Sequence, residues 1–255
     1  TILPIYFNYL AENSGVSSVD YLASWGYAAS ISTLAVAFIG PVFGALANTK
    51  GFKKPVFAVC VLSGVFCCGL LAIPQSWLVF LILFILAKIG YSSSLVFYDS
   101  MLGDITTRER MDGISSHGFA WGYIGSCIPF VISLIFVLFY ESIGIRLRSA
   151  MAAAIVIHAV WWLAAALPLL RSYKQIYYSE GERGAVKQSL ERLKNTIGEI
   201  RKNKKILLFL LAYFFYIDGV YTIIEMATAY GSALGLNTSG LLLALLVTQI
   251  VAFPF

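Results

Sequence analysis

Apolar residues fill long stretches of this chain and do not alternate with polar residues. Alternation is typical of half-buried strands, whereas an apolar run of about 20 residues is long enough to cross a membrane as an α-helix. The pattern therefore predicts an all-α polytopic membrane protein. Spanning helices are expected at residues 21–47, 55–72, 77–98, 114–140, 149–170, 205–229 and, incompletely, 239–255.

Both ends of the chain fall inside apolar runs. Residues 1–10 are too short to span a membrane and are expected to be the tail of a first helix whose start is missing. The chain also stops within an apolar stretch, at residues 253–255. We therefore expect part of a longer protein, truncated at both ends.

A polar segment separates the apolar spans into two groups. Within it, Leu190, Leu193, Ile197 and Ile200 recur at helical spacing among charged residues. This spacing predicts an amphipathic helix over residues 188–203, which either lies on the inner membrane surface or serves as a solvated linker. The predicted organisation is a six-helix N-terminal bundle at 1–170, a cytoplasmic linker at 171–204 and the start of a second bundle at 205–255.

Charge is scarce and unevenly placed. Hydrophobic residues make up 59% of the chain and charged residues 12%, against about 25% charged in soluble domains. Fifteen of the 18 lysines and arginines lie in alternate connections, at 48–54, 99–113 and 171–205, and the opposite connections hold only Arg146 and Arg148. Because basic loops stay in the cytoplasm, these three connections are predicted to be cytoplasmic, in a bacterial plasma (inner) membrane. Membrane lipid is the expected surrounding, and no nucleic-acid partner is expected.

The connection after the second predicted helix matches a known loop pattern. Five residues fall in register with the sequence Gly-x-Leu-Ala-Asp-Arg-x-Gly-Arg-Lys: Gly44, Leu46, Ala47, Gly51 and Lys53. That sequence is roughly the loop between helices 2 and 3 of the major facilitator superfamily, which this chain therefore resembles. Three positions depart from the pattern, because Asn48, Thr49 and Phe52 replace an acidic residue, an arginine and a further basic residue.

Four further stretches are more specific: Trp25-Gly26-Tyr27, Phe97–Asp104, Ser115–Tyr123 and Phe215–Val220. Together they resemble the "unidentified major facilitator" branch of the superfamily, which is related to the vacuolar amino-acid effluxers of autophagy. The resemblance extends over essentially the whole chain. It implies the major facilitator fold and the first two-thirds of a twelve-helix protein.

Ionisable side chains within the apolar spans are candidate functional groups, because charge is costly inside a membrane. Asp218 and Glu225 are two helical turns apart and share a face with Tyr221. Desolvation favours the neutral form of a carboxyl group, so either residue is predicted to accept a proton during coupling. The alternatives are an interhelical latch or, for Glu225, snorkelling to the outer interface. His158 is expected to be a packing residue.

Lys88 lies near the midpoint of its predicted helix, with Tyr91 on the same face. An unpaired ammonium in hydrocarbon costs roughly 3 kcal/mol, so Lys88 should face a cavity or a partner. Helices 1, 4, 7 and 10 line the central cavity of the superfamily, so the resemblance implies that Lys88, Asp218 and Asn8 surround one space. Lys88 would bind an anionic group there, or pair with Asp218 and release it when substrate binds. The alternative is a permanent structural ion pair.

The resemblance also implies a cytoplasmic gate. In the superfamily, carboxylates at the end of helix 4, here Asp99 and Asp104, pair with cations of the loop between helices 2 and 3, here Lys53 and Lys54. Such pairs hold one end of the cavity shut. Asn48 lacks a charge that normally strengthens this gate, so we expect a weaker one. The competing interpretation is an exposed helix end of little energetic importance.

The sequence contains no catalytic motif, cofactor fingerprint or metal-ligand spacing, so neither an enzyme nor a cofactor or metal site is expected. The resemblance implies a secondary active transporter that moves a small polar solute, an amino acid or similar metabolite, by alternating access. Tyr91 and Tyr221 are expected to stack on or hydrogen-bond that solute. Proton coupling and a monomeric state are further predictions. The alternative is a non-transporting scaffold or lipid-handling subunit on the same fold.

Overall fold

The computed structural model describes residues 2–73, 75–178 and 185–252. In these ranges the chain is helical apart from short connections, as the hydropathy pattern predicted. Six helices are long and apolar enough to cross a membrane, judged by length and composition. The elements are α1 (Ile2–Glu12), α2 (Ser18–Ala47), α3 (Lys53–Leu70), α4 (Trp77–Ile105), the 3₁₀ helix η1 (Arg108–Arg110), α5 (Met111–Leu138), α6 (Tyr140–Ile143), α7 (Leu147–Ser172), α8 (Ala185–Lys202), α9 (Lys204–Ala233) and α10 (Thr238–Ala252).

The helix predicted at 77–98 ends too early, because α4 continues to Ile105. Its last turns contain Asp99 and Asp104, and charged residues in the sequence indicated the end of the span. The side chain of Asp104 is nevertheless only 1% exposed, since Lys53 of α3 pairs with it. A buried charge is tolerated when it is paired and hydrogen-bonded. Asp104 at the end of α4 therefore belongs to the interior of the bundle, whereas Asp99 is exposed.

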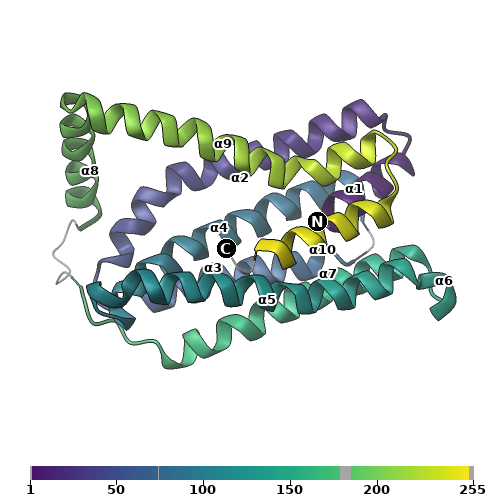
Figure 1. Ribbon diagram of the computed structural model, residues 1–255, viewed down its shortest axis with the longest axis horizontal. Helices are drawn as coiled ribbons and strands as arrows, with labels where there is room; N and C mark the ends of the chain where they lie inside the picture. Colours follow the sequence, from purple (N-terminus) through teal and green to yellow (C-terminus); the bar gives the residue numbers. More distant parts are fainter. Residues whose placement is uncertain (1, 74, 179–184, 253–255) are drawn as a thin grey trace.

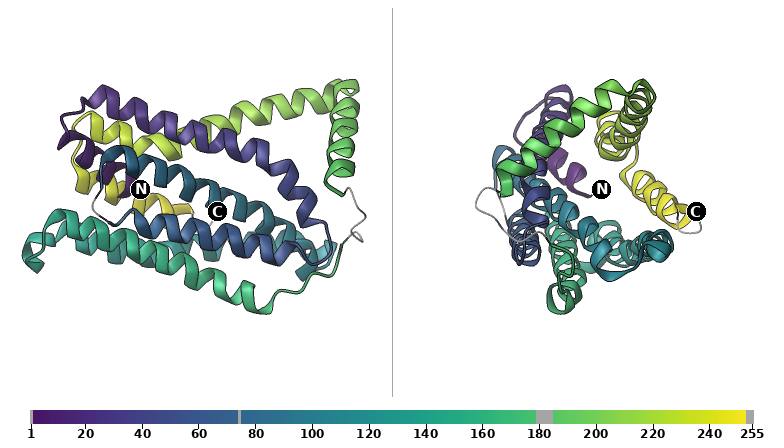
Figure 2. Two further views of the ribbon diagram at one scale, coloured as in Figure 1. Left: turned by 180° about the vertical axis from the view of Figure 1, so that it is seen from behind. Right: turned by 90° about the vertical axis from the view of Figure 1, so that its left-hand side faces the viewer.

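The spanning helices lie side by side, and their connections gather at two ends (Figure 1). The connections from α2 to α3 and from α4 to α5, and the segment after α7, lie at one end. We call it the basic end, because these connections carry most of the lysines and arginines. The connections from α1 to α2, α3 to α4 and α9 to α10 lie at the opposite end. The green helix α8 runs across the basic end and not along the spans (Figures 1 and 2).

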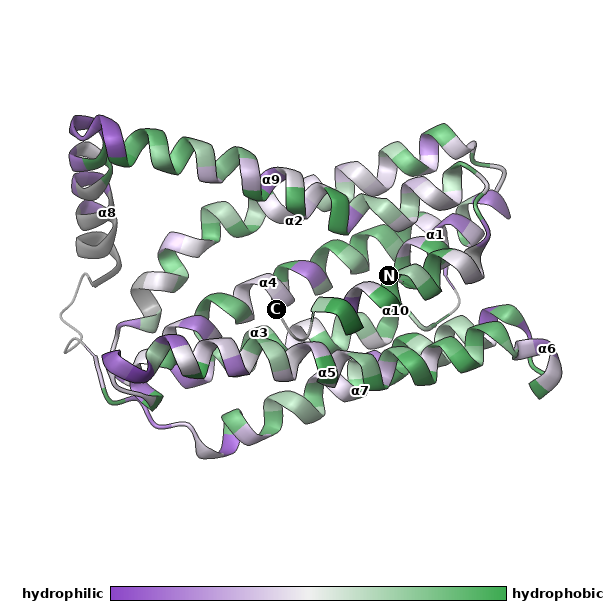
Figure 3. Cartoon of the chain, in the orientation of Figure 1, coloured by the Kyte–Doolittle hydropathy of each residue, from purple (hydrophilic) through white to green (hydrophobic). Residues whose placement is uncertain are grey.

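Helices α1 to α7 pack into what we call the first bundle. One cluster of buried apolar side chains, near the opposite end, surrounds α1 and includes Tyr6, Phe7 and Phe80. A second cluster, near the basic end, includes Phe57 and Phe97. The outer surfaces of the helices are also largely apolar (Figure 3). A large exposed apolar surface is typical of helices that face lipid.

Helices α3 and α4 cross at two glycines. A Cβ atom added to Gly90 would lie 2.8 Å from the Cα atom of Gly64, closer than real side chains come. A Cβ atom on Gly64 would in turn lie 2.4 Å from the ring of Trp162 on α7. Only glycine at both positions lets the two backbones approach this closely. The crossing fixes the middle of α4 one half-turn from Lys88.

Helix α9 packs on the first bundle over only part of its length. Near the opposite end, Thr228, Ala229 and Gly231 are buried and α9 contacts α1 and α2. Toward the basic end, the residues from Lys204 to Tyr216 are exposed in this chain. Figure 1 shows α9 and α2 crossing near their middles and separating toward the basic end, where α8 contacts both helices. Helices α9 and α2 are thus in direct contact toward the opposite end and are connected through α8 at the basic end.

Candidate functional site

An ion pair joins the two parts of the chain, from the central part of α4 to the opposite-end half of α9. The ammonium of Lys88, on α4, donates to Glu225 Oε2, on α9. The side chains of Lys88 and Glu225 are 16% and 30% exposed. Because an unpaired ammonium is costly inside a membrane, Glu225 explains how Lys88 is accommodated there. Helix α4 belongs to the first bundle, so the pair crosses from one part of the chain to the other.

Two contacts from α2 support the Glu225 side of this pair. The indole Nε1 of Trp25 donates to the backbone carbonyl of Glu225 over 3.4 Å. Trp25 is 3% exposed and stacks on Phe84 of α4, with ring centroids 4.3 Å apart. The terminal methyl of Met226 lies 3.8 Å from the position of a Cβ atom on Gly26. Helices α2, α4 and α9 therefore meet at one level, at the ion pair.

The predicted pair of Lys88 with Asp218 is not present, because Glu225 takes that place. Asp218 is exposed and has no hydrogen-bond partner among the described residues. Asp218 and Glu225 are seven residues apart, about 10 Å along a helix axis, so only one of them can lie level with Lys88. The amino-acid sequence holds no direct signal for this choice, because the relative height of α4 and α9 depends on how their surfaces pack.

Polar side chains continue from the ion pair toward the basic end along both helices. Helical spacing places Tyr91 and Asp99 on the Lys88 face of α4, and Tyr221 and Asp218 on the Glu225 face of α9. We call these six residues the polar track. Of the predicted substrate-site residues on these two helices, the structure pairs Lys88 with Glu225, and the others share their faces by helical spacing.

Asn8 lies elsewhere, which corrects its predicted place beside Lys88. It is 2% exposed on α1, and neither polar atom of its amide has a hydrogen-bond partner among the described residues. It lines a separate cavity of about 330 Å³ near the opposite end, together with Glu12 and Ser232. Lys88, Asp218 and Glu225 do not line that cavity.

The predicted gate residues form contacts inside the first bundle. Lys53 Nζ and Asp104 Oδ2 are 2.7 Å apart, with side chains 4% and 1% exposed, so this predicted pair is present. Lys54 donates to the backbone carbonyls of Arg171 and Tyr173 over 3.3 and 3.4 Å, and does not pair with a carboxylate. Asp99 is exposed and takes part in neither ion pair of the described residues. Asn48 is an exposed residue just after α2.

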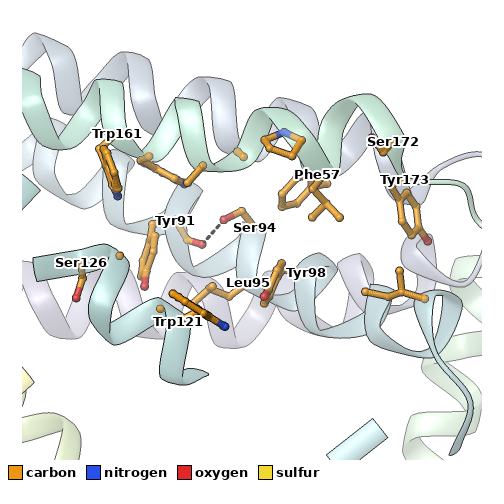
Figure 4. A pocket seen from close by; sticks show the side chains of 18 of the residues that line it. Phe57, Tyr91, Ser94, Leu95, Tyr98, Trp121, Ser126, Trp161, Ser172 and Tyr173 are labelled. Carbon is orange, nitrogen blue, oxygen red and sulfur yellow. Dashed lines mark hydrogen bonds between the residues drawn. The ribbon is translucent and has the colours of Figure 1, made fainter. Parts of the chain in front are cut away.

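A larger cavity of about 1260 Å³ lies within the first bundle, between α4, α5 and α7 (Figure 4). Its walls are aromatic, with Tyr91, Tyr98, Trp121 and Trp161 pointing into the space (Figure 4). Lys88 and Glu225 do not line it. His158 lines it and lies 2.8 Å from the carbonyl of Ala154 through Nδ1, which fits the predicted packing role. The charged pair therefore does not line this cavity, whereas Tyr91 of the polar track does.

The part of the chain that the structure describes contains no evident metal site. No group of three or more histidine, cysteine or acidic residues is placed to hold a metal ion there. The four cysteines, all in helices, form no disulfide. The charged and polar groups of the site are therefore those of the polar track.

Known proteins match this chain along its whole length. The family described as "vacuole effluxer Atg22 like" matches residues 13–111 and 104–254. The uncharacterized MFS-type transporter YxiO of Bacillus subtilis (strain 168) is 43% identical over 258 residues, covering 100% of this chain and 60% of the relative. No solved structure matches the chain. These matches and the membrane-spanning helices lead to one conclusion: the chain belongs to the Atg22-like vacuole effluxer family of MFS-type transporters.

Proposed function

We propose that the protein is a secondary active transporter which moves a small polar solute by alternating access, with its substrate site at Lys88 and Glu225. The observation that carries the proposal is the ion pair between these residues, since it joins the two parts of the chain within the membrane-spanning helices. Transporters of this kind bind substrate near the membrane midplane, between two bodies that rock against each other. The family match supports the same conclusion.

The pair also suggests the class of solute. A zwitterion, such as an amino acid, carries one group for each partner: a carboxylate for Lys88 and an ammonium for Glu225. Binding of such a solute would replace the ion pair without leaving either charge unpaired, which would be costly in a membrane. Tyr91 and Tyr221 would contact the body of the solute from the next turn of each helix.

Asp218 is our candidate for proton coupling. It lies on the polar track, two turns from Glu225, without a cation to hold it in the charged form. We expect Asp218→Asn to bind the solute but to lose accumulation driven by a pH gradient. Accumulation equal to that of the unmodified protein would contradict this role.

The orientation and partners follow from the charge distribution. We propose that the basic end faces the cytoplasm of a bacterial cell, because Lys and Arg concentrate there. The protein would then stand in the plasma membrane as a monomer, with lipid and solute as its partners. Labelling of an introduced cysteine at exposed Arg108 in intact cells tests this: a membrane-impermeant reagent should not reach it.

The second candidate function is a scaffold or lipid-handling subunit in which the Lys88–Glu225 pair is permanent. Both functions fit an ion pair, but they differ in what Lys88→Ala would do. A transporter should lose uptake while remaining folded. A scaffold should lose stability or assembly, with no uptake to lose.

Uptake of a radiolabelled amino-acid mixture by proteoliposomes containing the full-length protein tests the transport proposal. We expect Lys88→Ala and Glu225→Gln to reduce uptake by about tenfold or more, as expected when one charge of a partly desolvated pair is removed. Lys174→Ala is the matched control, because Lys174 is exposed and forms no ion pair in the described chain. Uptake that is unchanged in both variants would contradict the proposed site.

A further inference from the structure

The first residues after α7 are bound to the basic end of the first bundle by a dense set of hydrogen bonds. Asp104 is one centre of this set. Its Oδ1 accepts from the backbone N–H groups of Ile176 and Tyr177, over 3.0 and 2.8 Å. Its Oδ2 accepts from the Tyr173 hydroxyl and from Lys53 Nζ, the latter at 2.7 Å. One carboxylate thus holds α3 and the segment after α7 to the end of α4.

Gln175 is the second centre. Its Nε2 donates to the carbonyls of Ala47 and Thr49, both over 3.2 Å, and its Oε1 accepts from the N–H of Gly51 over 3.0 Å. These partners form the turn between α2 and α3, where Gly51 has a φ of +74°. Glycine adopts such a conformation at little cost. One amide side chain therefore satisfies the backbone of a turn more than 120 residues earlier in the chain.

Two further contacts close the same interface. The Lys50 ammonium lies 4.9 Å from the centroid of the Tyr178 ring, within range of a cation–π interaction. Burial and the hydrogen bond to Asp104 raise the pKa of Tyr173, so its hydroxyl keeps its proton and remains a donor. We call residues 173–178, residues 47–54 and Asp104 the linker clasp.

We propose that the linker clasp stays closed throughout the transport cycle, with Asp104 and Gln175 as its positioning residues, so that Lys53 and Asp104 are part of a fixed body and not a gate. The proposal rests on the proposed function, since it assigns segments to one of two moving parts. It differs from the gate that sequence similarity implied, because it predicts that the Lys53–Asp104 pair does not open.

The difference between a fixed contact and a gate lies in the number and the location of the bonds. A gate must break at low cost and must join the two moving parts. The side chains of Lys53 and Asp104 are 4% and 1% exposed. Opening the clasp would expose them or leave them, and several backbone groups, without hydrogen-bond partners. Among the described residues, its hydrogen-bond partners belong to α2, α3, α4, α7 and the segment after α7, and none belongs to α9 or α10. By contrast, Lys88 and Glu225 meet across the two parts through one ion pair.

Hydrogen exchange of the full-length protein tests the clasp without reference to transport. Gly51, Ile176 and Tyr177 amides should be protected in the unmodified protein. Gln175→Ala should speed exchange at Gly51 alone, and Asp104→Ala should speed it at Ile176 and Tyr177, each by about tenfold or more because hydrogen bonds to these acceptors are lost. Lys174→Ala, in the same segment, should change neither. Exchange of all three amides at unprotected rates in the unmodified protein would overturn the proposal.

A reversible cross-link tests permanence during transport. In a background without the native cysteines, Lys50→Cys and Tyr178→Cys place two exposed thiols across the clasp. A short, reducible bis-thiol reagent should join them, and amino-acid uptake should persist in the cross-linked protein. Loss of uptake that reduction restores would show that the clasp opens and would overturn the proposal.

A second cysteine pair provides the contrast. Ser126 of α5 and Gln249 of α10 lie 2.8 Å apart through their side-chain oxygens, across the two parts of the chain. The same reagent on Ser126→Cys with Gln249→Cys should stop uptake until reduction. If the protein shows no uptake before any cross-linking, the proposed function fails instead, while the exchange measurement still decides whether the clasp is closed.

Discussion

Lys88 is held by groups from three helices: its ion-pair partner on α9, the tryptophan of α2 that contacts Glu225, and the glycine crossing of α4 with α3. The ion pair satisfies the charge, and the glycines set the height of α4. Lys88 depends on both, because its charge must reach a partner or water inside a membrane, and the height of α4 decides whether Glu225 is within reach.

Gly90→Ala should destabilise the protein. The added Cβ atom would lie 2.8 to 3.0 Å from backbone atoms of Gly64 and Cys60, and backbone cannot turn aside as a side chain can. We expect a cost of about 1–3 kcal/mol, typical of overpacking, measured as a lower midpoint of thermal unfolding in detergent.

Gly103→Ala on the same helix is the matched control, because a Cβ atom there has no atom within 4 Å. It should be neutral or slightly stabilising, since alanine favours helix more than glycine does. Equal effects of the two substitutions would contradict the close crossing.

At the scale of elements, hydrophobic length predicted each spanning helix of the described chain, because the membrane imposes one requirement on all of them. Prediction from the sequence was wrong where a tertiary contact determined the end of a helix or the partner of a side chain. α4 runs on to Ile105 because Lys53 pairs with Asp104, and Glu225 faces Lys88 in place of Asp218 because of how α9 packs. The amphipathic pattern predicted α8, although a surface role and a linker role fit it equally.

The Lys53–Asp104 contact makes a quantitative prediction for α3 and α4. In a double-mutant cycle, Lys53→Met and Asp104→Asn should couple by more than about 1 kcal/mol, because the pair is buried and breaking one side leaves a charge without its partner. Lys54→Met and Asp99→Asn form the matched cycle, in which no coupling is expected, since these side chains do not pair. Denaturant unfolding of the reconstituted protein measures both. Equal coupling in the two cycles would mean that the observed pairing does not contribute to stability.

At the scale of the whole molecule, the chain consists of a first bundle and a second part, which contacts it through α10 on α5, α9 on α1 and α2, and α8 on α2. The chain spans 60% of the length of the Bacillus subtilis relative. In the proposed transporter, this arrangement corresponds to a conformation open at the basic end. The Lys88–Glu225 pair lies where contact between the parts gives way to separation, so it should stabilise this conformation over one open at the other end.

The distance between the two parts at the basic end tests this account most directly. Spin labels at exposed Arg108 and Lys205 of the full-length, otherwise cysteine-free protein would report it by double electron–electron resonance in liposomes. Removing a partly buried ion pair shifts a two-state equilibrium by about tenfold. We therefore predict that Lys88→Ala gains a population with a shorter distance, while Lys174→Ala does not. Identical distance distributions in the unmodified protein and in Lys88→Ala would contradict the account.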